Sequence, residues 1–217
     1  MKNIYLPIIL LLGLSLTGCG PSAYSIKVNG YTDLTAPTWL PAGSSFFVID
    51  NREAKNPLLE KEIKDKINKL LEKYGYRVAP QEQADYYLFF AYGLGQERSV
   101  TVAMPDYYPF GLGFGAGGGY RSYFFVSPYV GYYPYTETIY DRWLLINVVD
   151  GKYYREKGQW RAIWVGEARS AGASADLRTV INYLLLADFQ QFGKNTGKAV
   201  TVEIEAQAPV VYGLTTQ

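Results

Sequence analysis

The chain has 217 residues and is almost neutral, with 21 basic against 20 acidic side chains, so no polybasic surface for nucleic acid is expected. It contains no histidine and a single cysteine, Cys19. These absences exclude Ser-His and Cys-His catalysis, most zinc sites and an intrachain disulfide. The length is sufficient to bury a core and suits one domain, or one domain with a large insertion.

The N-terminus has the features of a lipoprotein signal peptide. Lys2 supplies a positive charge, and residues 4–16 form an apolar stretch of about thirteen residues, which is too short to span a bilayer. The stretch ends in residues that look like a lipobox: Leu16, Thr17, Gly18 and Cys19. Small side chains before the cysteine let a signal peptidase reach the backbone, and the thiol accepts a diacylglyceryl group. We therefore expect residues 1–18 to be removed.

Lipid on Cys19 is expected to hold the mature chain on a membrane. Several acyl chains on one residue give stable anchoring, whereas a single chain gives only marginal binding. Residues 19–23 form a short tether, so the domain should lie close to the lipid. Gly20 follows Cys19, and by resemblance to lipoproteins of two-membrane bacteria this favours the outer membrane, with the domain facing the periplasm. The leaflet and the oligomeric state stay open.

The first part of the domain is predicted to contain strands around one long helix. Short alternating or apolar stretches predict strands over 24–28 and 46–50. Asn56-Pro57 is typical of a helix start, the following apolar residues recur at steps of three and four, and Gly75 is typical of a stop. Further strands are predicted over three short segments: 76–79, 85–92 and 99–103.

The second part is predicted to contain two longer strands, a helix and a final strand. The strands cover 139–149 and 159–169, and a turn begins at Asp150-Gly151. Four residues of the second strand are expected to share one face: Trp160, Ala162, Trp164 and Ala168. An amphipathic helix follows Ser174, and alternating residues predict a strand that ends at residue 205.

These elements predict a single α+β domain over residues 24–205. Two amphipathic helices would pack on one face of a mostly antiparallel sheet, which is an α/β sandwich. Residues 206–217 look like a flexible tail.

Residues 107–135 form an insertion composed almost entirely of Gly, Tyr, Phe, Pro and Ser, with Arg121 as the only charge. Its GxGxxG sequence lacks the preceding strand and following helix of a dinucleotide site. Two interpretations stay open: a flexible surface loop, or a contact surface for a protein subunit, a glycan, the lipid interface or another copy. The candidate contact residues are Tyr107, Tyr108, Phe110, Phe114, Tyr120, Tyr123, Phe124, Tyr129, Tyr132 and Tyr133.

No catalytic, cofactor-binding or metal-binding residue is predicted. Four carboxylates lie on or near the later strands: Glu137, Asp141, Asp150 and Glu167. None belongs to a motif that requires an acid and a base. Pairing across strands with Arg142, Arg161 or Arg169 explains them equally well.

The order of motifs resembles the DUF4136 family of bacterial lipoproteins over roughly residues 24–192. The shared order is a lipobox, an amphipathic helix (56–78), a strand opening at Ala84-Asp85, the Gly/Tyr/Pro-rich insertion, LLINVVDGK (144–152), WRAIWVGEA (160–168) and a last helix. The chain lacks the family's usual Asp-rich opening strand. The resemblance implies an α/β sandwich near the outer membrane with no established catalytic residue, and it transfers only the lipidated Cys19.

The expected function is therefore that of a non-enzymatic outer-membrane lipoprotein. By analogy with other envelope lipoproteins of this size, it would be a structural or interaction subunit of a cell-envelope complex, such as a secretion or assembly machine. The expected partners are the membrane, through the N-terminal lipid, and a protein of the envelope, with no nucleic acid and no cofactor. The alternative is a cell-wall glycan-binding protein or a carboxylate-dependent hydrolase, which would need two acids opposed across a cleft.

Overall fold

The computed structural model describes residues 23–33, 40–51, 53–107 and 130–215, which build one seven-stranded sheet in the order β3-β2-β4-β5-β6-β1-β7. The strands are β1 (Ala23–Thr32), β2 (Ser45–Ile49), β3 (Arg77–Val78), β4 (Tyr86–Tyr107), β5 (Val130–Asp150), β6 (Ala162–Gly172) and β7 (Val200–Glu205). The expected signal peptide and Cys19 lie outside these ranges.

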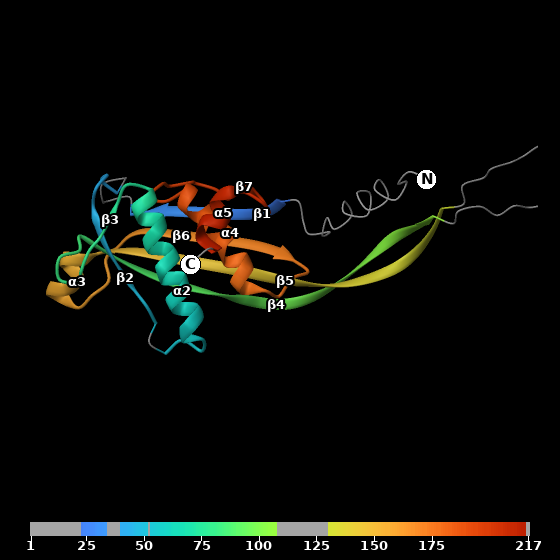
Figure 1. Cartoon of the computed structure of the whole chain (residues 1–217), viewed down its shortest axis with the longest axis horizontal. Coiled ribbons are helices and arrows are strands. Elements are labelled where there is room, and N and C mark those ends of the chain that lie inside the picture. The colour runs from blue at the N-terminus through green and yellow to red at the C-terminus, as the bar shows by residue number, and fades with distance from the viewer. Residues whose placement is uncertain (1–22, 34–39, 52, 108–129, 216–217) are drawn as a thin grey trace, which may run out of the picture.

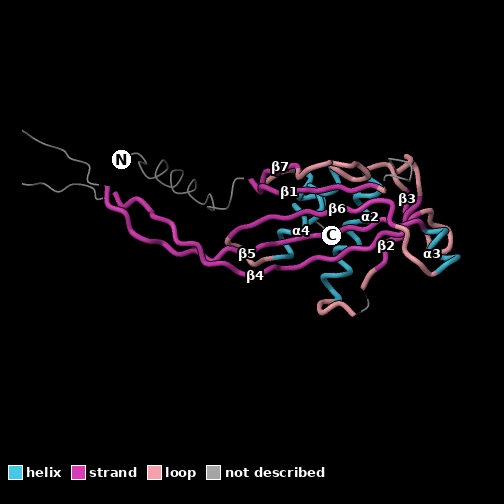
Figure 2. The backbone as a smooth tube through the Cα atoms, turned by 180° about the vertical axis from the view of Figure 1, so that it is seen from behind, coloured by secondary structure: helices cyan, strands magenta, loops and turns pink. Residues whose placement is uncertain are grey.

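Helices cover one face of the sheet. α2 (Pro57–Lys73) packs on β2 and β3, whereas α4 (Leu177–Gln190) packs on β1, β5 and β6 (Figure 1). Seen from the opposite side, the strands have no helix across them apart from α3 (Gly151–Lys157) at one end (Figure 2). The domain therefore has a covered face and an open face.

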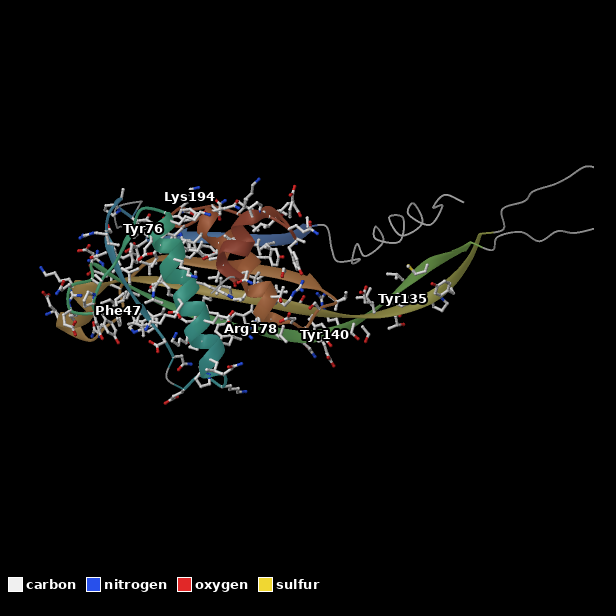
Figure 3. All side chains as sticks on the ribbon, viewed as in Figure 1. Phe47, Tyr76, Tyr135, Tyr140, Arg178 and Lys194 are labelled. Carbon is white, nitrogen blue, oxygen red and sulfur yellow. The ribbon has the colours of Figure 1, made fainter. Side chains whose placement is uncertain are left out.

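The core lies between the sheet and the two long helices. Its strand residues alternate with open-face residues, as in Leu144, Ile146 and Val148 of β5, all of which are fully buried. The helices contribute mainly aliphatic side chains: Ile63, Ile67, Leu70, Leu71, Val180, Ile181, Leu184 and Leu185. Arg178 of α4, labelled in Figure 3, also bonds through its guanidinium to the Glu62 carboxylate of α2, with an Nε to Oε2 distance of 2.8 Å.

α2 begins and ends where local signals place it. The Asn56 side chain accepts a hydrogen bond from the backbone N–H of Leu59 at 3.1 Å, and Pro57 occupies the first turn. Gly75 follows the helix with a φ of 84°, a conformation that favours glycine. The predicted helix is thus confirmed.

Asn56→Ala is expected to lower the free energy of unfolding by about 1 kcal/mol, because the Leu59 amide loses its capping acceptor. Urea denaturation monitored by circular dichroism measures the change. Lys69→Ala, at an exposed position within the same helix, serves as the control and should change stability by less than about 0.5 kcal/mol. Equal stability of the Asn56→Ala variant and the unmodified chain would contradict the capping role.

The predicted α+β class is confirmed, and the sheet is mixed. β2 runs parallel to both β3 and β4, while β4, β5, β6, β1 and β7 pair antiparallel in that order. The parallel pairing follows from α2, because parallel neighbours require a crossover connection.

Two segments differ from their predicted structure: the turn after β5 and the expected tail. Asp150 does not begin a simple turn; its side chain caps α3 by accepting a hydrogen bond from the Tyr153 N–H at 2.9 Å. In the expected tail, α5 (Pro209–Thr215) packs on α4 and buries Val211 and Leu214. Apolar residues in a chain end gain by burial, so this segment docks on the domain.

The prediction that Trp160 shares a face with Trp164 is also wrong. Trp164 and Ala168 share the buried face, and Ala162 is exposed. Trp160 precedes β6, is 57% exposed and stacks on Phe89 at a ring-centroid distance of 4.3 Å. The pairing of β5 with β6 shifts register between Val148 and Val149, which interrupts the alternation on which the prediction depended.

β4 and β5 continue far beyond the rest of the sheet. Their pairing extends from Tyr86 opposite Asp150 to Tyr107 opposite Val130. The pairing of β5 with β6 ends at Tyr140. The residues beyond that point, 98–107 and 130–139, form a two-stranded projection that we call the arm (Figures 1 and 2). The predicted loop is therefore wrong for residues 107 and 130–135, which lie in strands, while residues 108–129 lie outside the described ranges.

Candidate interaction surfaces

Most of the sequence-predicted site residues lie outside the described ranges. The expected processing and lipidation residues lie outside the described ranges: Leu16, Thr17, Gly18 and Cys19. So do most of the aromatic contact candidates: Tyr108, Phe110, Phe114, Tyr120, Tyr123, Phe124 and Tyr129. Tyr107 ends β4, Tyr132 lies in β5, and Tyr133 is 47% exposed on the arm.

The arm has one apolar and one polar face. Cross-strand partners in an antiparallel pair point to the same side, and successive residues alternate between sides. One face therefore combines apolar side chains that are each 41–47% exposed: Val100, Val102, Met104, Tyr133 and Tyr135, the last labelled in Figure 3. The other face carries hydroxyl side chains toward the root, where the Oγ1 atoms of Thr101 and Thr136 hydrogen-bond at 2.9 Å, and Ala103 opposite Pro134 farther out.

Nothing in the described part of the chain covers the apolar face of the arm. The two arm strands pair only with each other, so each also has a free backbone edge. A two-stranded ribbon is marginally stable in water, and exposed apolar patches mark interaction sites. Tyr133 was a contact candidate from the sequence, whereas the side of the ribbon on which each residue lies follows only from the strand register.

A second surface lies on the open face of the sheet, at the root of the arm. The structure has a groove of about 830 Å³ there, whose apolar floor includes Trp143 and Leu145 of β5. The indole of Trp143 lies against Gly93 of β4, its cross-strand partner. Glycine leaves the space that the indole occupies, since a β-carbon at residue 93 would come within 2.9 Å of the ring. Lys27 and Arg169, directly opposite each other on β1 and β6, form one side of the groove.

The carboxylates of the groove are held by arginines, although the predicted pairs differ. Asp141 accepts a hydrogen bond from Arg98 across β4 and β5 at 2.7 Å, and Glu167 pairs with Arg169 of its own strand. Arg142 points instead to the covered face, where it is buried and donates to the Ser174 carbonyl at 3.3 Å. The expected cross-strand pairing with Arg142 is therefore wrong.

Asp188 of α4 is a buried acid that the sequence analysis missed. It is fully buried beneath β6, and within the described residues neither carboxylate oxygen has a hydrogen-bond partner. α4 can approach β6 because residue 166 is glycine, since a β-carbon there would lie 2.5 Å from Asp188 Oδ2. Burial raises the pKa of Asp188 well above its usual value, because water no longer solvates the charged form.

Asp188→Asn is expected to flatten the dependence of stability on pH. The folded chain keeps the Asp188 carboxyl protonated, whereas the unfolded chain ionises it near about pH 4. The contribution of the protonated Asp188 carboxyl to the free energy of unfolding is therefore fully present below that pH. It is lost as the pH rises toward the raised pKa of Asp188 in the folded chain. Urea denaturation at a series of pH values from about 4 to 8 measures it. If the free energy of unfolding changed with pH in the same way for the variant and the unmodified chain, Asp188 would have the same pKa in the folded and the unfolded state, against the prediction.

The described residues contain neither a group of three or more acidic, cysteine or histidine residues suited to a metal ion nor a helix long and apolar enough to cross a membrane.

Comparison with known proteins gives a family match and distant structural likenesses. The family described as "Domain of unknown function (DUF4136)" matches residues 31–192. No curated protein matches the chain. A PDZ domain protein from Parabacteroides distasonis is similar with a TM-score of 0.42 and 14% identity over 85% of this chain, which covers only 39% of that protein.

Two other solved structures are similar over most of their own length. A PelC dodecamer from Paraburkholderia phytofirmans has a TM-score of 0.40 and 11% identity, over 78% of this chain and 98% of that one. A DUF4136 family protein from Bacteroides thetaiotaomicron has a TM-score of 0.36 and 16% identity, over 79% and 94%. Likenesses this distant carry no argument about what the chain binds.

Proposed function

The chain belongs to the DUF4136 family, and from that premise we propose that it is a non-enzymatic outer-membrane lipoprotein that serves as an interaction subunit of a cell-envelope complex. The observation that supports this proposal most directly is the groove on the open face of the sheet. Antiparallel sheets often expose one face to water, but such a face normally carries polar side chains. Here its centre carries the half-buried Trp143 and Leu145.

The charges beside Trp143 favour a protein partner with an acidic side chain. Lys27 and Arg169 are direct cross-strand neighbours, and like charges in that position repel each other. Arg169 is partly neutralised by Glu167, while Lys27 has no carboxylate partner among the described residues. A carboxylate placed between the two cations would remove the repulsion, and an apolar side chain beside it would cover the indole. Aromatic and arginine side chains are enriched in the centres of protein interfaces.

The glycan-binding alternative is supported by Trp143 alone, because an accessible indole beside charged side chains can stack on a sugar ring. The hydrolase alternative lacks such support. Both carboxylates of the groove, Asp141 and Glu167, are engaged by arginines rather than opposed to each other as a free acid and base.

Co-purification from cross-linked native membranes tests the proposed function. The unmodified lipoprotein is expected to purify with a protein partner in mild detergent, and the double variant Lys27→Glu/Arg169→Glu is expected to retain at least tenfold less of it. The control is Lys69→Glu, which reverses a charge on the exposed side of α2. The chain with this substitution should still purify with the partner. Circular dichroism establishes that all three chains are folded.

Either of two results would overturn the proposal. One is purification of the unmodified chain without a protein partner. The other is retention of the partner by the double variant, which would exclude the groove as the contact. Capture of cell-wall fragments instead of a protein would favour the glycan-binding alternative.

A further inference from the structure

The arm leaves the domain at the end where the lipid tether begins. β5 runs from the arm into the domain, β6 is antiparallel to β5, and β1 is antiparallel to β6. β1 therefore starts at the arm end, where Tyr140 pairs with Gly172 (Figure 1). Ala23 lies about two strand spacings, or roughly 10 Å, from the root of the arm.

The chain before Ala23 limits how far the start of β1 can lie from the lipid. Cys19 precedes Ala23 by four residues, and four residues span at most about 14 Å when fully extended. The arm has ten residues in each strand from its root to Tyr107 and Val130, which corresponds to roughly 33 Å. An arm more than twice as long as the tether, projecting from the same end, is therefore long enough to reach the membrane surface that would hold Cys19.

The two faces of the arm suit the boundary between lipid headgroups and acyl chains. Amphipathic helices lie in this boundary with the apolar face toward the acyl chains, and a ribbon with two unlike faces meets the same requirement. Tyrosine is enriched there because its ring is apolar and its hydroxyl is polar. The apolar face has Val102 opposite Tyr135, whereas the polar face has Thr101 opposite Thr136. Glu137 and Arg98, the charged side chains of the apolar face, lie toward the root.

The free backbone edges fix the depth at which the arm can lie. The hydrocarbon core contains no water to bond unpaired N–H and C=O groups, so an open two-stranded ribbon cannot cross it. At the level of the headgroups, those groups remain hydrated. The arm is therefore suited to lie along the surface and not to span the bilayer.

We propose that the arm is a second membrane contact, which lies in the interface of the bilayer that holds the lipid on Cys19 and turns Val100, Val102, Met104, Tyr133 and Tyr135 toward the acyl chains. The proposal rests on the lipid anchor of the proposed function but not on the protein partner. Together the lipid and the arm would hold the domain in a fixed orientation, with the groove presented to its partner.

A single introduced thiol tests the depth of each face. Cys19 is the only cysteine, so once it is acylated a new cysteine is the only reactive thiol. Full-length lipidated Val102→Cys and Thr101→Cys chains would each carry an environment-sensitive fluorophore and be reconstituted in phosphatidylethanolamine and phosphatidylglycerol vesicles. Fluorescence at position 102 is expected to be quenched at least threefold more by lipids brominated in the acyl chain than fluorescence at position 101. Tyr135→Cys and Thr136→Cys repeat the comparison on β5.

The results distinguish failure of the membrane contact from failure of the lipid anchor. Equal quenching at both faces, or quenching at position 102 by aqueous iodide alone, would overturn the membrane contact. Protection of position 102 from both quenchers would also overturn it, since a second copy or a protein would then cover the arm. Labelling of Cys19 in the unmodified chain would overturn the anchor on which the proposal rests. Loss of the protein partner would leave all these readings unchanged, because the vesicles contain none.

Discussion

Trp164→Ala is expected to lower the free energy of unfolding by about 3–5 kcal/mol, the usual cost of removing a large aromatic side chain from a core. Trp164 is 1% exposed, and its ring meets Phe192 edge-on at a centroid distance of 4.8 Å. Its indole N–H donates to the Lys194 carbonyl at 3.0 Å. Alanine would leave a cavity between β6 and the end of α4, and it would also leave that carbonyl without its donor.

Urea denaturation measures this loss, and Trp160→Ala provides the matched control. The control makes the same change of side chain at a position that is 57% exposed and stacked on Phe89. It should cost about 0.5–1.5 kcal/mol, the usual contribution of an aromatic pair. Similar losses in the two variants would contradict the positions of the two tryptophans on opposite sides of the sheet.

The helices could be predicted because their signals are local. Asn56 and Pro57 start α2 through contacts within one turn, and Gly193, with a φ of 74°, follows α4 where a left-handed residue is needed. The apolar stripe of α2 recurs at helical spacing, so its buried side was also evident in the sequence. These features require no knowledge of the rest of the chain. The stripe predicted for α4 covers only part of what is buried, because every residue from Val180 to Phe189 is buried.

Only the β4 half of the arm was predicted in part, as a strand over 99–103, because the β5 half contains strand breakers. Proline removes a ladder hydrogen bond and is found on edge strands, so Pro134 in a Gly/Tyr-rich segment indicated a loop. In the structure Pro134 pairs with Ala103 inside a ribbon whose outer edges are free. A missing N–H costs little at a free edge, and this freedom exists only because β6 ends opposite Tyr140.

The groove and the buried acid depend on contacts between distant segments. Lys27, Trp143 and Arg169 come from three strands, and only the register of β1, β5 and β6 brings them into one row. Asp188 interrupts an apolar helix, and its burial follows from the absence of a side chain at Gly166. Neither arrangement has a sequence signature, whereas the family could be recognised from the order of its motifs.

Cys19→Ser is expected to abolish incorporation of labelled palmitate and to leave the chain at precursor size. A serine hydroxyl does not accept the diacylglyceryl group at the lipobox, so processing before residue 19 would stop. Metabolic labelling and gel electrophoresis of cell fractions measure both effects, and Ser22→Ala, outside the lipobox, should be labelled and cleaved normally. Cleavage and labelling of the Cys19→Ser chain like the control would contradict the proposed lipid anchor on Cys19. The short tether would then no longer bring the arm to the membrane, so the proposed location of the chain and the proposed orientation of its groove would both fail with this one result.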